Sequence, residues 1–341
     1  MRTDPAPTGT DLAGHVALPA PRGATSEALL AALREPPHRL PPIALPDAPD
    51  PLADEDLQLA LYCCYELHYR GLPGVDERWE WSPSLLALRG ALEERFEAAL
   101  RAAVGPVEPP PAPGEMDRAL RAVEDADDAP SLSRHVERDA TVDQVLEFMV
   151  HRSAYQLKEA DPHSWAIPRL SGPPKAALVE IQADEYGGGR PERVHAQLFA
   201  DAMDAAGLDS RYGAYLHRLP AATLATVNLM SLCGLHRRLR GAIVGHLALF
   251  EMTSSIPNRR YASGLRRLGL EAATPFFDEH VEADAVHEAI AAVDLAGGLA
   301  RQEPELAAAI LWGARALMTL EGRWSRTLLS AWERGESSLR T

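Results

Sequence analysis

The sequence is poor in cysteine and in aromatic residues. It has three cysteines in 341 residues, and two of them, Cys63 and Cys64, are adjacent. Three cysteines make no disulfide framework, so we interpret them as small buried core residues. The lack of disulfides favours a reducing, cytoplasmic compartment. Phenylalanine and tyrosine number only 6 and 8, whereas alanine, leucine, glutamate and arginine dominate. This composition predicts a mostly helical protein.

The sequence is also poor in basic charge and lacks long apolar runs. Its 34 Lys and Arg residues are outnumbered by 49 Asp and Glu residues, which gives a formal net charge of −15. Nucleic acids and anionic membranes require basic surfaces, so neither is an expected partner. No run is long and apolar enough for a transmembrane helix, and the start of the chain lacks the pattern of a signal peptide. We therefore expect a cytoplasmic protein.

Proline, with 28 residues, divides the chain into segments. The clearest break is GPVEPPPAPG at residues 105–114, which is typical of a stiff connector. Helical periodicity is weak before residue 50 and strong elsewhere, and no β-hairpin pattern is present. The predicted segments are a Pro-rich flexible or strap-like tail (1–50), an N-terminal helical extension (51–104), a Pro-rich connector (105–115) and the main helical domain (116–335).

One stretch, FFDEHVEADAVHEAI at residues 276–290, has a pattern typical of metal binding. It lies in a predicted helix over residues 276–294 and places His280, Asp284 and His287 at i, i+4 and i+7, on one narrow stripe. Imidazole and carboxylate donors together suit iron, manganese and zinc. The alternative is an amphipathic surface helix that happens to be rich in histidine.

Three stretches resemble a known family: LKEADPHSWAIPRL, ALVEIQADEYGGGRPERVHAQLF and PFFDEHVEADAVHEA. They are similar to the haem-oxygenase-like diiron oxidases and oxygenases, also described as iron-containing redox enzymes. The resemblance covers about residues 140–325. It implies an all-α, haem-oxygenase-like bundle of about seven core helices that holds two non-haem irons, with manganese as the alternative metal.

The resemblance also implies which residues bind the metals. The family's pattern has a Glu on one helix, a Glu and a His on the next, and His-x-x-x-Asp-x-x-His on a third. In this sequence, the matching residues are Glu159, Glu185, His195, His280, Asp284 and His287. The expected catalytic residues are Glu159, Glu185 and His280. Glu159 lies on a helix predicted over residues 142–160. Tyr155 and Glu251 are expected to support the ligands from outside the metal sphere.

The spacing of Glu185 and His195 tests this assignment. Ten residues of unbroken helix would separate them by about 15 Å and about 280° of rotation, so they could not share a site. The glycines at 187–189 and Pro191 interrupt the helix and allow the chain to change direction. Glu192 is an alternative ligand to Glu185, because it gives the Glu-x-x-His spacing of ferritin-like bundles.

The function that the resemblance implies is O₂-dependent oxidation of a small organic substrate, either amino-acid-like or fatty-acid-like. An external reductant is the expected partner, and a homodimer is compatible with the sequence. The alternatives are a non-catalytic metal- or small-molecule-binding protein on the same scaffold, or a mononuclear metal hydrolase. A haem site fits poorly because its axial ligand is one residue on an open face. Thiamin-degrading chemistry of the TenA type needs an activated cysteine, and Cys233 has no evident base.

Overall fold

The structure, a computed structural model, describes residues 16–110 and 112–341, apart from the side chains of residues 113 and 282–286. These residues form helices and connecting segments without a single strand, which confirms the all-α prediction. None of the described helices has both the length and the apolar character needed to cross a membrane. The α-helices are α1 (Ala24–Leu33), α2 (Glu55–Glu66), α3 (Pro83–Val104), α4 (Met116–Asp125), α5 (Leu132–Arg138), α6 (Val142–Gln156), α7 (Asp161–Ser164), α8 (Gly172–Glu185), α9 (His195–Ala205), α10 (Ala221–Leu235), α11 (Arg240–Met252), α12 (Ser255–Arg267), α13 (Pro275–Ala289), α14 (Gly297–Gln302) and α15 (Ala307–Glu333).

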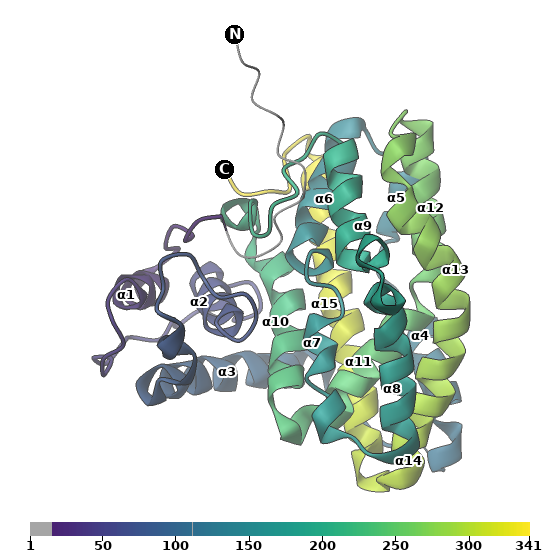
Figure 1. Ribbon diagram of the computed structural model, residues 1–341, viewed down its shortest axis with the longest axis horizontal. Coiled ribbons are helices and arrows are strands. Elements are labelled where there is room, and N and C mark those ends of the chain that lie inside the picture. Colours follow the sequence, from purple (N-terminus) through teal and green to yellow (C-terminus); the bar gives the residue numbers. More distant parts are fainter. Residues whose placement is uncertain (1–15, 111) are drawn as a thin grey trace.

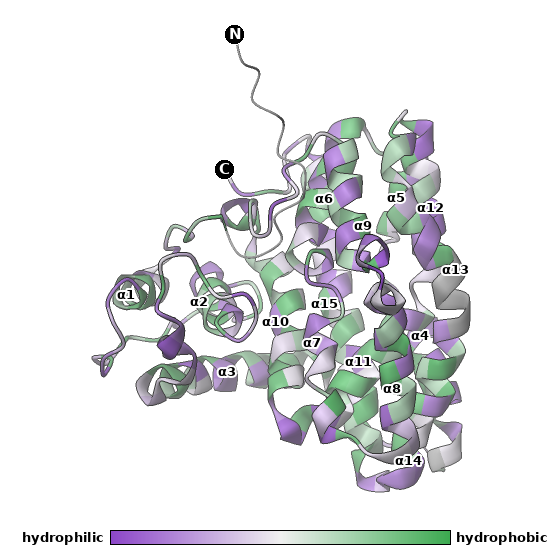
Figure 2. Cartoon of the chain, in the orientation of Figure 1, coloured by the Kyte–Doolittle hydropathy of each residue, from purple (hydrophilic) through white to green (hydrophobic). Residues whose placement is uncertain are grey.

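The long helices from α6 onward form a bundle, and α1, α2 and α3 lie together at one side of it (Figure 1). Helix α2 packs on α10, and α3 runs across the bundle direction to reach α15. Figure 2 shows that the outer helix α12 is largely hydrophilic, whereas α11, inside the bundle, is largely hydrophobic. The bundle therefore encloses its apolar surface, and α11 lies at its centre.

Local sequence signals explain where several helices begin. The Asp54 side chain accepts a hydrogen bond from the backbone N–H of Leu57 and caps α2. Thr141 and Gln144 form a reciprocal capping box at the start of α6, as expected for a Thr followed three residues later by Gln. Pro83 occupies the first turn of α3, where its missing N–H costs no helical hydrogen bond. These starts are determined by residues within one turn.

Helices α11 and α15 approach each other closely. A Cβ atom at Gly245 on α11 would collide with the backbone carbonyl of Ile310 on α15. The contact therefore requires the absence of a side chain at this position, as the glycines of α11 suggest. This close packing holds α11 in place, so Glu251, near its C-terminal end, faces the bundle interior and is buried.

The N-terminal helices share the apolar core of the bundle. One continuous cluster of buried residues includes Leu29 and Leu30 of α1, Leu61 of α2 and Phe96 of α3, together with residues of α10, α11 and α15. The residues before position 50 thus include a packed helix, and the segment after it contacts α3, where the backbone N–H of Leu40 donates to the Ser84 hydroxyl. The division of the chain into four segments remains a prediction.

A buried ion pair connects the N-terminal region to the bundle. Lys158 Nζ lies 2.9 Å from Glu66 Oε2, and the two side chains are only 1% and 0% exposed. The second carboxylate oxygen of Glu66 accepts a hydrogen bond of 2.6 Å from the Tyr212 hydroxyl. The Lys158 ammonium also lies over the rings of Tyr62 and Tyr69. All these groups surround the residue directly before Glu159.

We predict that Gly245→Ala lowers the free energy of unfolding by about 1–3 kcal/mol, because the new methyl group overpacks the α11–α15 contact. Gly90→Ala on α3 is the matched control, since no atom lies within 4 Å of a Cβ at that position. Removing this half-buried helical glycine should leave stability unchanged or raise it by about 0.5–1 kcal/mol. Urea denaturation followed by circular dichroism measures both, and equal effects would contradict the packing argument.

We predict that Lys158→Met lowers the free energy of unfolding by about 3–5 kcal/mol, because it leaves the Glu66 charge buried without its partner. Arg334→Met is the control, since the Arg334–Glu336 pair is 57% and 59% exposed and contributes less than about 1 kcal/mol. The same denaturation experiment compares them. A loss for Lys158→Met no larger than the loss for the control would show that the buried pair does not stabilise the fold.

Candidate metal centre

Glu159 lies just beyond the end of α6. The helix stops at Gln156, and residues 157–160 form a turn instead of continuing the predicted helix to residue 160. Ala160 has a φ of 73°, the only positive φ of a residue other than glycine in the described chain. Such a conformation is costly for a residue with a Cβ and is found preferentially at functional sites. The turn directs the Glu159 carboxylate into the bundle while Lys158 points to α2.

Glu185 and His195 meet across the break between α8 and α9. Helix α8 ends at Glu185, and the segment 187–193 forms two short 3₁₀ turns before α9 begins at His195. Gly187 has a φ of 70°, and a Cβ there would lie 2.7 Å from the backbone of Arg193, so this reversal requires glycine. It brings His195 Nδ1 to 2.9 Å from Glu185 Oε2.

The two described histidines of α13 are oriented by neighbouring acceptors. His280 Nδ1 lies 2.8 Å from the Phe276 carbonyl oxygen, which can only accept, so Nδ1 carries a proton and donates. His287 Nε2 likewise lies 3.1 Å from the Asp184 carboxylate. Each ring therefore directs its other nitrogen inwards: His280 Nε2 lies 3.5 Å from Glu159 Oε1, and His287 Nδ1 lies 3.4 Å from Glu251 Oε2. Such outer hydrogen bonds are typical of metal-binding histidines.

These side chains form two groups that share one carboxylate. In the first group, one donor atom each from Glu159, Glu185, His195 and His280 lies within 4.8 Å of the others. In the second group, Glu185, Glu251 and His287 meet the same criterion. All six residues are buried. Glu185 has two oxygens and belongs to both groups, so the arrangement suits two neighbouring cations bridged by a carboxylate.

The pKa shifts reflect the density of charge at the site. Burial acts to raise the pKa of Glu185, but the nearby imidazole of His195 outweighs it and holds that pKa at about 2. Burial acts to lower the pKa of His287, but its contact with Glu251 outweighs this and raises that pKa to about 9. The Glu185 carboxylate is thus ionised, and a proton on His287 supplies part of the balancing charge. A bound cation would displace this proton.

The donor set fits a metal better than a network of hydrogen bonds. Within the described residues, Glu159 Oε2, His195 Nδ1 and His287 Nδ1 are buried and have no hydrogen-bond partner of acceptable geometry. Buried polar atoms are nearly always satisfied, so such a concentration requires an explanation. A small cavity of about 10 Å³ is lined by Glu159, Glu185, Glu251 and His280. Carboxylate and imidazole donors around such a space suit iron or manganese.

The structure brings five of the six predicted ligands to these two groups, and the metal-binding role of each remains a prediction. The sixth, Asp284, lies on α13 between His280 and His287, but its side chain is outside the described residues. Glu192, the alternative to Glu185, is exposed in a short 3₁₀ turn and belongs to neither group. Glu251 was expected only to support the ligands, yet its carboxylate belongs to the second donor group, 3.4 Å from His287 Nδ1.

The remaining candidates have other environments. Tyr155 lines the small cavity between the two groups, and burial raises the pKa of its hydroxyl well above the usual range, so it remains protonated. His151 contacts the hydroxyls of Thr223 and Ser338, as expected for a satisfied polar residue. Burial raises the pKa of the Cys233 thiol. This thiol is therefore protonated and enclosed, unlike a nucleophile of the TenA type.

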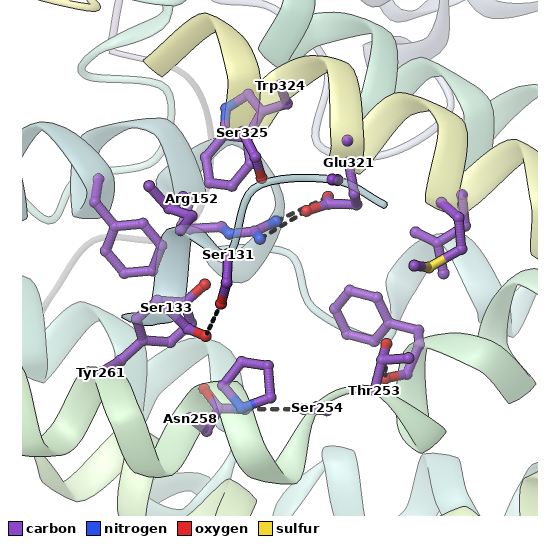
Figure 3. A pocket seen from close by; sticks show the side chains of 18 of the residues that line it. Ser131, Ser133, Arg152, Thr253, Ser254, Asn258, Tyr261, Glu321, Trp324 and Ser325 are labelled. Carbon is purple, nitrogen blue, oxygen red and sulfur yellow. Dashed lines mark hydrogen bonds and ion pairs between the residues drawn. The ribbon is translucent and has the colours of Figure 1, made fainter. Parts of the chain in front are cut away.

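A larger cavity of about 220 Å³ reaches the first group, with His280 in its lining. Figure 3 shows this cavity with Arg152, Tyr261 and Glu321 around it. Its walls come mainly from α6, α12 and α15 and from the segment before α5, with single residues or pairs from α5, α9, α11 and α13. Phe250 lines both this cavity and the small one, and the exposed Asp127 is also part of the larger cavity's lining. The cavity thus leads from the surface of the bundle to a side chain of the candidate metal centre.

Comparison with known proteins agrees with this geometry. A family model described as iron-containing redox enzyme matches residues 146–322, just over half of the 341-residue chain. The matched range includes Glu159 and every other residue of the two donor groups. No curated protein sequence matches the chain. The chain belongs to the haem-oxygenase-like family of iron-containing redox enzymes.

Proposed function

We propose that the protein is a non-haem diiron oxidase or oxygenase that uses O₂ and an external reductant to oxidise a small organic substrate. The family indicates an iron-dependent oxidoreductase. The single observation behind the finer proposal is the position of Glu185, whose carboxylate belongs to two buried donor groups at once. One cation would leave part of this set unused, whereas two cations bridged by Glu185 would use all of it.

In this proposal, Glu159, His195 and His280 would hold one iron, and Glu251 and His287 would hold the other. Glu185 would contribute a donor to both, because it belongs to both groups. Asp284 is retained as a ligand of one of the irons because it lies one turn after His280 on α13. Manganese accepts the same donors, and iron is proposed because the chain belongs to an iron-containing family.

The bound irons would supply electrons to O₂ and so make it reactive towards a C–H or N–H bond. The chain contributes binding, orientation and exclusion of water. Burial of Glu159, Glu185 and His280 keeps bulk water from the reacting atoms. Phe276 and Asp184 fix the two histidine rings through hydrogen bonds. The cavity beside His280 holds the substrate next to the metals, which replaces a random encounter with a fixed orientation.

We predict that the purified metal-free chain, loaded anaerobically with Fe(II) and freed of excess metal, retains about two irons per chain and consumes O₂ when reductant is supplied. Iron is measured by a colorimetric chelator assay and O₂ by an electrode. A chain that holds no iron, or that holds iron but is inert to O₂ with and without substrates, would favour a non-catalytic binding protein on the same scaffold.

Single substitutions test the proposed sharing of Glu185. Glu185→Gln should reduce retention of both irons, because it weakens both donor groups. His280→Ala should affect mainly the first iron. Glu192→Gln is the matched control and should retain both irons, since Glu192 is exposed and outside both groups. Loss of iron in Glu192→Gln with full retention in Glu185→Gln would show that the assignment of the bridging residue is wrong.

We predict that Fe(II) raises the melting temperature of the metal-free chain, because a ligand at about 100 times its Kd stabilises the folded state by about 2.7 kcal/mol. Glu159→Gln should affect the metal-free chain and the Fe(II)-loaded chain differently. It removes a buried charge that lacks a full set of partners, so the metal-free variant should melt no lower than wild type. The stabilisation by Fe(II) should be smaller than in wild type. Scanning fluorimetry under nitrogen measures both, and an undiminished iron effect would exclude Glu159 as a ligand.

A further inference from the structure

The cavity beside His280 has a charged pair in its wall. Arg152 of α6 donates hydrogen bonds of 3.0 and 2.8 Å to the two carboxylate oxygens of Glu321 on α15. Both side chains line the cavity and are only 19% and 22% exposed (Figure 3). The Arg152 guanidinium also lies over the ring of Trp324. This bidentate geometry is among the strongest for an arginine and a carboxylate.

The pair leaves the cavity without a free cation. Burial acts to lower the pKa of Arg152, but Glu321 outweighs it and raises that pKa above its usual range, so Arg152 is charged and already neutralised. Among the described residues that line the cavity, Arg152 is the only lysine or arginine. Asp127, which is exposed, adds a negative charge to the lining. A ligand with a carboxylate head group would therefore have to compete with Glu321 for Arg152.

The same wall has an acceptor that lacks a donor. Gln156 lies one helical turn after Arg152 on α6, lines the cavity and is only 9% exposed. Its side-chain oxygen Oε1 is buried and accepts no hydrogen bond from the described residues. Leaving a buried acceptor unpaired is unfavourable, and a ligand with an N–H donor would correct it. The Glu321 carboxylate, which uses one lone pair per oxygen for Arg152, can accept further hydrogen bonds.

The rest of the wall is mixed. Its polar side chains include Ser131, Ser254, Asn258 and Tyr261, and its apolar side chains are mainly aromatic and aliphatic: Phe148, Phe250, Phe277, Trp324 and Leu317. These side chains offer a surface for a hydrophobic or aromatic ligand body. The cavity thus combines apolar surface with the acceptors of Gln156 and Glu321, and its lining has two carboxylates against one guanidinium. It also contains one buried donor without a partner among the described residues, Trp324 Nε1.

We propose that this cavity binds an organic amine, whose N–H groups donate to Gln156 Oε1 and Glu321 and whose apolar body lies against the aromatic wall. An aliphatic amine is protonated at neutral pH, as the lysine side chain is, so it also matches the charge of the cavity. The claim that this amine is the substrate rests on the proposed function. The claim that the cavity selects amines rests only on the residues that line the cavity.

Matched pairs of small molecules test the selectivity for amines. The probes are 2-phenylethylamine against 3-phenylpropionate, and hexylamine against hexanoate, with phenylalanine as the zwitterion. Calorimetry and saturation-transfer NMR measure binding to the full-length chain, both metal-free and loaded anaerobically with Fe(II). In each pair, the amine should bind at least about tenfold more tightly than the acid, since the acid finds no free cation and cannot satisfy Gln156.

Two variants locate the binding. Gln156→Leu, which keeps the side-chain volume, should weaken amine binding by about five- to tenfold and leave acid binding unchanged. Glu321→Gln should free Arg152 and shift the preference towards the acids. Gln302→Leu, on the exposed surface of α14, is the control and should change neither. Melting curves confirm that each variant is folded.

Acids or phenylalanine binding as tightly as the amines would overturn the proposal, as would the absence of amine binding in both pairs or an unchanged amine affinity in Gln156→Leu. These outcomes are separable from failure of the proposed function. Amine binding that depends on Gln156 in a chain that retains no iron would support the pocket and contradict the diiron enzyme. Two retained irons without amine selectivity would support the diiron enzyme and contradict the amine pocket.

Discussion

The structure depends on the burial of the Glu185 carboxylate among charged and polar groups that have few hydrogen bonds. Moving an ionised carboxylate out of water costs several kcal/mol unless opposite charge and hydrogen bonds replace the water. Here His195 and His287 approach Glu185 from α9 and α13, while Glu159 and Glu251 add further negative charge nearby. Protons on the imidazoles compensate only part of that charge. Two divalent cations would compensate it more fully and would also satisfy the orphaned donor atoms.

Irregular backbone around the site makes this arrangement possible. Without these interruptions, helices α6, α8 and α13 would continue in straight lines, and their acidic and histidine side chains would not converge. Residues 157–160 turn at Ala160 after α6, and residues 187–193 reverse the chain at Gly187 between α8 and α9. After α13, residues 290–296 adopt a π-helix, a rare form that often accompanies functional sites. The regular helices supply a rigid frame, and these interruptions direct the side chains inwards. Lys158, held by Glu66, anchors the first interruption from outside the bundle.

Much of the fold was predictable because helix signals are local. The proline at the start of α3, the capping box of α6 and the glycine break after α8 were each visible within a few residues. The prediction was wrong in extending α6 to residue 160 and in continuing an α-helix from 276 to 294. At both places the backbone is irregular next to the site, and this tertiary arrangement overrides local helix propensity.

The grouping of the site was only partly predictable. The stripe of His280 and His287 predicted metal binding, but it did not indicate that the two rings, two turns apart, join different donor groups that share Glu185. Glu251 was noticeable as a carboxylate in an apolar helix, but its contact with His287 depends on how α11 packs on α13. The pair of Arg152 and Glu321 joins residues 169 positions apart, so no sequence pattern could reveal that the cavity lacks a free cation.

The central claim is that Glu185 bridges two irons. The most direct measurement is X-ray diffraction from crystals of the chain grown anaerobically with Fe(II), recorded on both sides of the iron absorption edge. We expect two anomalous peaks in the bundle interior, one beside Glu159, His195 and His280 and the other beside Glu251 and His287, with Glu185 between them. A single peak that Glu185 does not contact, or no peak at these residues, would contradict it.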